Sequence, residues 1–121
     1  MYDHIGIHVR DLETSLRFFR SALATLGLEV CAQDNASAGL GPKGEPALWL
    51  YQRSAGAAGT GTHIALRAPS RAAVDRFHQE GPKAGGRDNG APGLRIDYSA
   101  NYYAAFLIDP DGNNVEAVCQ S

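Results

Sequence analysis

Two histidines and one glutamate are the residues of this chain best suited to chemistry. His4 and His63 each precede alternating apolar and polar residues, and Glu116 lies between Val115 and Ala117. Because side chains alternate between the two faces of a strand, all three should project away from the neighbouring apolar residues. Two imidazoles and a carboxylate from three strands suit a divalent metal ion such as Fe, Mn, Ni or Zn, and three protein ligands leave positions open for a substrate.

An internal repeat supports this interpretation. A histidine in a strand more often forms an ordinary hydrogen bond than binds a metal, so neither histidine alone would justify a metal site. However, His4 and Ile5 match His63 and Ile64, and the turn GPKG at 41–44 matches the turn DPDG at 109–112. The two histidines therefore hold equivalent places in two copies of one unit, which favours the metal site over the ordinary role.

The elements that must position these residues follow the same order in both halves. In the first half we predict a strand over 1–9, a helix that Asp11 caps and Gly27 ends, a strand over 28–31, a turn-rich stretch at 34–39 and a strand over 47–51. In the second half we predict a strand over 62–68, a helix that starts at 69–70 and ends at 85–86, a loop or tight turn over 88–93, and strands over 102–108 and 115–119.

This order predicts an α+β fold made of two tandem βαβββ modules, whose mixed sheets form an open barrel around a cleft. Module one spans 1–53, a Gly-rich linker spans 54–61 and module two spans 62–121, all within a single domain. One such module is too small to bury its own sheet face. The two should therefore pack together and leave a pocket at their junction.

Composition excludes several classes of partner. The 121 residues are 44% hydrophobic and 20% charged, which is ordinary for a globular domain, and the net charge of −2 gives no reason to expect nucleic acid or an anionic membrane as a partner. The apolar stretches are too short to span a membrane and the N-terminal residues do not resemble a signal peptide, so we expect a cytoplasmic protein. Cys31 and Cys119 are expected to be reduced thiols rather than a disulfide or a zinc site.

Further residues are candidates for the pocket wall. His8 shares a strand face with His4, although plain exposure is an equally good explanation. The aromatic stretch 102–106 indicates either a pocket wall or ordinary core packing, and Arg67 and Arg95 indicate contact with an anion or, more commonly, solvated side chains. The segment 88–93 either covers the cleft or is an ordinary connection. We predict substrate contacts from five residues: His8, Leu48, Arg67, Tyr102 and Phe106.

Three stretches of the chain resemble the vicinal-oxygen-chelate superfamily, which includes glyoxalase I, extradiol dioxygenases, methylmalonyl-CoA epimerase, fosfomycin-resistance transferases and bleomycin-resistance proteins. They are HIGIHVRDL at 4–12, HIAL at 63–66 and DPDGNNVE at 109–116, and the resemblance covers nearly the whole chain. It implies a glyoxalase-like fold with His4, His63 and Glu116 at metal-binding positions. It also implies a homodimer with clefts that both subunits complete.

The chain departs from individual members of that superfamily. Glyoxalase I has a fourth metal ligand, a glutamate in the last strand of its first module, whereas the repeat aligns Leu48 with Glu116. This difference argues against a lactoylglutathione lyase. The fosfomycin-resistance transferases carry a tyrosine where we place Phe106, which argues against that activity.

Two hypotheses about function follow. The first is a divalent-metal-dependent enzyme acting on a small oxygen-bearing substrate, of lyase, isomerase or dioxygenase type. The second is a metal-free small-molecule-binding protein like the bleomycin-resistance proteins. The presence of all three ligands favours the enzyme, whereas the missing fourth ligand and the apolar stretch 48–50 favour the binding protein.

Overall fold

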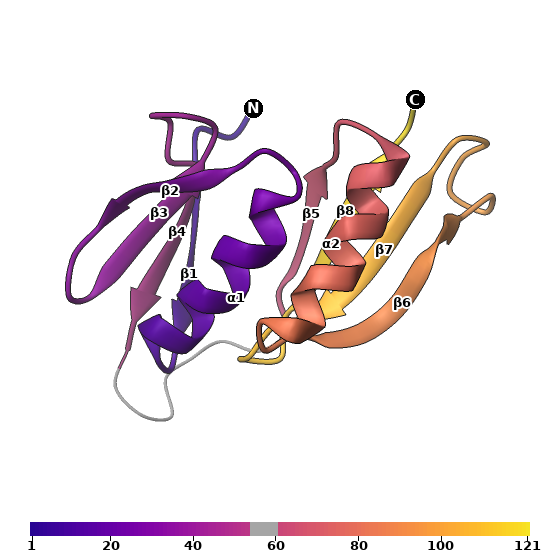
Figure 1. The fold of residues 1–121 in the computed structure, drawn as a ribbon. Helices are drawn as coiled ribbons and strands as arrows, with labels where there is room; N and C mark the ends of the chain where they lie inside the picture. The colour runs from indigo at the N-terminus through magenta and orange to yellow at the C-terminus, as the bar shows by residue number, and fades with distance from the viewer. Residues whose placement is uncertain (54–60) are drawn as a thin grey trace.

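The chain folds into two βαβββ modules that repeat one another, which confirms the predicted fold class (Figure 1). This computed structural model describes residues 1–53 and 61–121, so the predicted linker 54–61 lies, except for Gly61, outside the described residues. Module one contains β1 (Ile5–Val9), α1 (Leu12–Ala24), β2 (Glu29–Gln33), β3 (Ser37–Gly41) and β4 (Leu48–Gln52). Module two contains β5 (His63–Arg67), α2 (Arg71–Lys83), β6 (Arg87–Leu94), β7 (Tyr103–Ile108) and β8 (Asn114–Cys119).

Each module has a four-stranded mixed sheet with the same strand order. The order is β1-β4-β3-β2 in module one and β5-β8-β7-β6 in module two, and the first strand of each module runs parallel to the last. The edge strands β1 and β5 face each other in the middle of the molecule, and α1 and α2 lie side by side over the same side of the two sheets (Figure 1). Each sheet therefore keeps one open face that its helix does not cover.

Local sequence signals set the ends of the helices. At the start of α1 the Asp11 side chain accepts a hydrogen bond from the backbone N–H of Thr14 at 3.3 Å, and at the start of α2 Ser70 accepts one from Ala73 at 3.1 Å. Such caps satisfy backbone donors that the helix itself leaves without partners. Gly27 follows α1 with φ of +83°, a backbone conformation that favours glycine and turns the chain towards β2.

Buried contacts hold the two modules together. Phe18 of α1 reaches module two, where a Cβ on Gly86 would lie only 2.3 Å from the Phe18 ring. The buried carboxylate of Asp111 accepts hydrogen bonds from the Ser15 hydroxyl at 2.9 Å and from the Arg10 backbone N–H at 3.1 Å. Because a buried carboxylate is costly without such partners, these bonds fix how module one sits on module two.

Two segments predicted as turns or loops contribute to strands instead. The stretch 34–39 includes the start of β3, and the stretch 88–93 lies within β6. β3 is made of small or fully buried residues, which give no alternating pattern. β6 is an edge strand that tolerates Pro92, and its pairing with β7 shifts register around Gly90, so its turn-like composition reflects an irregular strand edge.

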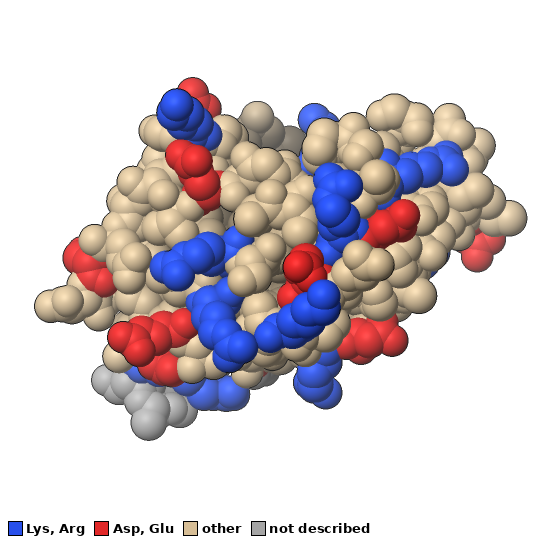
Figure 2. Space-filling model, in the orientation of Figure 1, with Lys and Arg blue, Asp and Glu red and all other residues tan. Residues whose placement is uncertain are grey.

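The helical side of the molecule is polar. Figure 2 shows Lys and Arg side chains gathered over the middle of this side, with Asp and Glu among them. Exposed residues of the two helices include Arg17, Arg20, Arg76 and Lys83. In the described part of the chain, neither helix has the length and apolarity to span a membrane.

Candidate functional site

The buried carboxylate of Glu116 is the centre of the candidate site. Glu116 lies in β8, between β5 and β7, and only 2% of the residue is exposed. Its neighbours Val115 and Ala117 belong to the hydrophobic core. Alternation along the strand therefore places Glu116 on the open face of the sheet, as the sequence predicts. A carboxylate buried in this way needs partners, and those partners decide what it can do.

Two side chains hold the two oxygens of Glu116. His63 Nε2 lies 3.2 Å from Oε1, and the Tyr102 hydroxyl donates a hydrogen bond to Oε2. Among the residues that the structure describes, His63 is the only ion-pair partner of Glu116. Burial, with the hydrogen bond to Glu116 as a further cause, raises the pKa of Tyr102 to about 12, so its hydroxyl remains a donor at neutral pH. A phenol thus orients one carboxylate oxygen while an imidazole faces the other.

His63 connects this carboxylate to a cavity between the modules. Its side chain is 53% exposed at the start of β5. A cavity of about 570 Å³ lies along β1 and β5, and His8 and His63 line it together with Gly6 and Ala65. The structure thus has a cavity at the module junction, where the sequence predicts a pocket, with an imidazole from each module on its wall.

A single chain does not bring His4 to this carboxylate. His4 precedes β1 and is half exposed, and its Nδ1 lies 2.7 Å from the Asp3 carboxylate. It lines a different cavity of about 560 Å³, together with Glu45 and Trp49. Within residues 1–53 and 61–121, no three His, Cys, Asp or Glu side chains are grouped so that they could hold a metal ion. One chain therefore joins His63 to Glu116 but keeps His4 apart.

Strand pairing corrects the sequence alignment of Leu48 with Glu116. Ala65 of β5 lies opposite Glu116 of β8. Gly6 holds the place in β1 that Ala65 holds in β5, and Gly6 lies opposite Trp49 of β4. Trp49 is thus the structural counterpart of Glu116. The alignment is shifted because the connection from the GPKG turn to β4 is one residue longer than the connection from the DPDG turn to β8. Leu48 instead packs into the hydrophobic core, so it lies away from the open face where we predicted a substrate contact.

Aromatic rings occupy the open face of module one. The rings of Trp49 and Tyr51 stack with their centroids 6.3 Å apart and their planes 12° apart, and the His8 ring lies 5.9 Å from that of Tyr51. Two glycines leave room for these rings, because a Cβ on Gly6 would lie 2.6 Å from Tyr51 and one on Gly39 would lie 2.9 Å from Trp49. The place equivalent to Glu116 therefore offers a flat aromatic surface instead of a second carboxylate.

Two further predicted residues lie at different distances from the carboxylate. Phe106 of β7 is paired with Glu116 across the sheet, and its ring centroid lies 6.4 Å from that of His63. Arg67 is exposed at the end of β5 and lines a separate cavity of about 390 Å³ with Val118 and Gln120. Phe106 thus belongs to the surroundings of Glu116, whereas Arg67 lies farther along the sheet.

Both sequence and fold match known proteins. A family model described as the Glyoxalase/Bleomycin resistance protein/Dioxygenase superfamily matches residues 2–117. The chain belongs to this superfamily. A search of curated proteins gave no match.

Solved structures related to the superfamily share the fold of this chain. A glyoxalase/bleomycin resistance protein from Albidiferax ferrireducens T118 is 27% identical, with a TM-score of 0.85 over 100% of this chain and 99% of that one. A glyoxalase/bleomycin resistance protein/dioxygenase family enzyme from Burkholderia phytofirmans PsJN is 17% identical, with a TM-score of 0.74 over 98% of each chain. A glyoxalase I mutant from Zea mays is 23% identical, with a TM-score of 0.72 over 97% of this chain and 46% of that one. These likenesses confirm the glyoxalase-like fold with two modules and open sheets.

Sequence reasoning missed the aromatic pair on module one of this superfamily member. Trp49 and Tyr51 share a strand face, and alternation alone could have paired them. Their placement over Gly6 and Gly39 depends on the register between strands, for which the sequence gives no direct signal.

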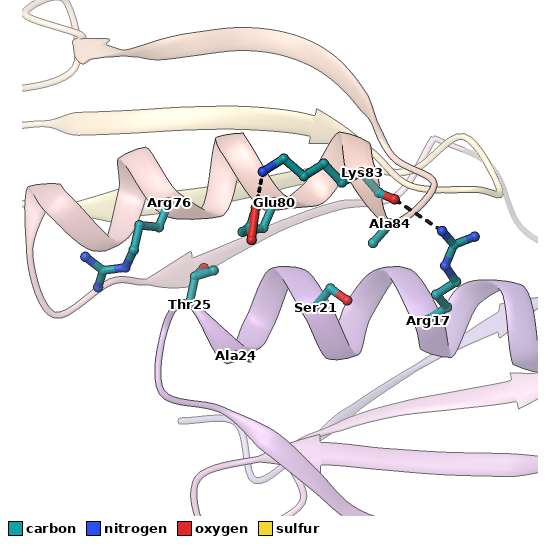
Figure 3. Close-up of a pocket in the computed structure, with 8 residues that line it drawn as sticks. All are labelled: Arg17, Ser21, Ala24, Thr25, Arg76, Glu80, Lys83 and Ala84. Carbon is teal, nitrogen blue, oxygen red and sulfur yellow. Dashed lines mark hydrogen bonds and ion pairs between the residues drawn. The ribbon is translucent and has the colours of Figure 1, made fainter.

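A cavity of about 520 Å³ on the helical side lies away from these residues. It runs between α1 and α2 and is lined by Arg17, Arg76, Glu80 and Lys83 among others (Figure 3). Lys83 pairs with Glu80 at 2.9 Å, and Arg17 donates a hydrogen bond to the Lys83 carbonyl at 3.2 Å. Because Glu80, Lys83 and Arg17 already have partners within this group and the described lining contains no histidine, we assign the chemistry to the open faces of the sheets.

Proposed function

We propose that this chain is a divalent-metal-dependent enzyme that acts on a small oxygen-bearing substrate by lyase, isomerase or dioxygenase chemistry. The observation that carries the proposal is the buried Glu116 carboxylate, which lies beside the half-exposed imidazole of His63. Imidazole nitrogens and carboxylate oxygens are ligands of Fe, Mn, Ni and Zn. The hydrogen bond from Tyr102 is the kind of outer contact that orients a ligating carboxylate.

We propose a homodimer in which His63 and Glu116 of one chain and the partner subunit's His4 hold the metal ion. This arrangement accounts for the separation of His4 from the other two residues within one chain. When bound by three side chains, the ion would polarise substrate oxygens and stabilise the negative charge that develops on them. The proposal includes a cytoplasmic location, which rests on the composition of the sequence.

The protein's own residues would then bind and orient the substrate. The rings of Phe106 and of the Trp49–Tyr51 pair offer apolar surface that excludes water from a bound molecule. Tyr102 keeps its proton at neutral pH and holds the carboxylate in one orientation. His8, on the wall of the junction cavity, is a candidate for donating or accepting a proton.

The alternative function is a metal-free protein that binds a small molecule. The Trp49–Tyr51 stack favours it, because an aromatic surface takes the place that is equivalent to Glu116. Such a protein would bind a planar ligand through ring stacking and would not depend on His63.

Metal content distinguishes the two functions. Protein purified without chelators and then titrated with Fe, Mn, Ni and Zn should bind close to one ion per chain, and His63→Ala and Glu116→Gln should each abolish that binding. His78→Ala is a matched control, because His78 also lies beside a carboxylate, with Nε2 2.8 Å from Asp88, but in a pair outside the site. Absence of stoichiometric metal in the wild type, or retention of metal by His63→Ala, would contradict the enzyme.

Subunit mixing tests whether two chains share the site. In a mixed dimer of His4→Ala and His63→Ala chains, one of the two shared sites regains its full set of ligands. Random mixing should therefore restore about a quarter of the wild-type metal sites, because about half of the dimers are mixed. If the wild type binds metal but the mixture restores none, the partner subunit's His4 is not a ligand.

A further inference from the structure

Arg95 places a positive charge beside the candidate site. It directly follows β6, and its guanidinium carbon lies 5.3 Å from the centroid of the Phe106 ring. Phe106 is paired with Glu116 across the sheet, so the two side chains share the open face. The guanidinium is therefore separated from the Glu116–His63 pair by a single aromatic ring.

The backbone of β6 holds this guanidinium in one orientation. Arg95 Nη1 donates to the Gly93 carbonyl at 2.8 Å, and Nη2 donates to the Ala91 carbonyl at 2.7 Å. Two glycines make room for it, because a Cβ on Gly90 would lie 3.3 Å from Nη2 and one on Gly93 would lie 3.3 Å from Nη1. Stacking on Phe106 completes the cradle, so little side-chain entropy remains to be lost when a ligand binds.

The held guanidinium still has binding capacity. A guanidinium carries five N–H donors, and the two bonds to β6 use one donor on each terminal nitrogen. In the described part of the chain, no Asp or Glu forms an ion pair with Arg95. A half-buried, oriented guanidinium without a carboxylate partner matches the planar geometry of an oxyanion.

We propose that Arg95 is a specificity-determining residue that binds an anionic group of the substrate, a carboxylate or a phosphate. This inference rests on the proposed function, because it places the anionic group next to the oxygens that the metal would hold. The sequence offered both Arg67 and Arg95 for such a contact, but Arg67 is exposed and lines a separate cavity. Its contacts with an aromatic ring and with the backbone distinguish Arg95 from Arg67.

Binding of simple anions to the full chain tests this inference. We would titrate the protein with benzoate, phenyl phosphate and the neutral benzamide, first as purified and then with a chelator present, and follow binding by NMR or calorimetry. The wild type should bind at least one of the anions about tenfold more tightly than benzamide in both conditions. The preferred anion identifies the carboxylate or the phosphate as the group that the site accepts.

Variants assign the preference to one arginine. Arg95→Met should remove the preference for anions, and Arg95→Lys should retain only part of it, because an ammonium cannot bind an oxyanion as a planar fork. Arg67→Met, and Arg20→Met on the helical side, should leave the preference unchanged. Thermal melting checks that each variant folds. If Arg95→Met does not fold, a comparison of Arg95→Lys with Arg67→Lys replaces it.

The two proposals fail in different measurements. Equal binding of the anions and benzamide by the wild type would overturn the role of Arg95, as would loss of the preference in Arg67→Met. Neither result affects the metal stoichiometry that tests His63 and Glu116. Conversely, a wild type without metal that still prefers anions in the presence of chelator would overturn the enzyme but support anion binding by Arg95.

Discussion

The hydrogen bond from Tyr102 to Glu116 should stabilise the fold and orient the candidate metal ligand at the same time. Tyr102→Phe removes one oxygen atom and leaves the ring in place. Glu116 is only 2% exposed, so water would have little access to the oxygen that loses its donor. The variant therefore isolates the contribution of one charge-assisted hydrogen bond.

The expected loss follows from the burial of Glu116. A hydrogen bond to a charged group contributes about 1.5–3 kcal/mol, so the free energy of unfolding should fall by that amount. For 121 residues the entropy of unfolding is about 0.25 kcal/mol/K, which converts this loss into a decrease in Tm of about 6–12 °C. If Glu116 ligates a metal, the affinity for that metal should also fall about 10- to 100-fold, because the carboxylate loses its orienting contact.

Urea unfolding of the chelated protein measures the first effect, and metal titration measures the second. Tyr98→Phe is the matched control, because the Tyr98 ring lies 5.1 Å from that of Tyr102 but the residue is 66% exposed. The control should change the free energy of unfolding by less than about 0.5 kcal/mol. A Tyr102→Phe variant as stable as the control would refute the view that this hydroxyl satisfies a buried carboxylate.

Three further outcomes are expected. Ser15→Ala should lower the free energy of unfolding by about 1–3 kcal/mol, measured in urea, because buried Asp111 loses the hydroxyl that links the modules. Gly81→Ala should destabilise the chain by about 1–3 kcal/mol in the same assay, since a Cβ there would lie 2.1 Å from the Leu107 side chain, and this strain exceeds the gain in helix propensity. Tyr102 has a pKa of about 12 in the folded chain against an ordinary value of 10.0, so its protonated hydroxyl contributes stability that is complete below pH 10 and is lost as the pH rises towards 12. Urea unfolding at several alkaline pH values should therefore show a fall in the free energy of unfolding, and part of that fall should be missing in Tyr102→Phe.

Each of these outcomes has a control. Ser21→Ala alters a serine of the same helix that lines the cavity on the helical side, and it should have little effect. Leu107→Ala in the Gly81→Ala background should recover part of the strain, and a purely additive loss would contradict the predicted clash. Identical pH profiles for the wild type and Tyr102→Phe would contradict the assigned role of the Tyr102 hydroxyl.

The faces of the strands could be predicted from the sequence because alternation is a local property. Ile7, Val9 and Ile64 are buried beneath the helices, whereas Glu116 lies on the open face, as the period of two requires. The duplicated order of elements was equally readable, because the caps Asp11 and Ser70 act within a few residues of their own positions.

The register between strands could not be predicted, and it changed the composition of the candidate site. Because one connection in module one is a residue longer than its counterpart in module two, Trp49 and not Leu48 lies at the place equivalent to Glu116. A shift of one residue turns every side chain of a strand to the opposite face, so a small error in alignment assigns a core residue to the pocket. The prediction of a loop or tight turn over residues 88–93 was wrong for a related reason, because this segment pairs irregularly with β7 as part of β6.

The sequence by itself determined that this chain has two equivalent βαβββ modules and that His63 and Glu116 lie on open faces, because these features depend on local periodicity and on repetition. Only the tertiary structure decided which groups meet: Tyr102 with Glu116, and Arg95 with Phe106. It also separated His4 from Glu116 within one chain. Such contacts join residues far apart in the sequence or depend on exact register, and packing of the whole chain sets them.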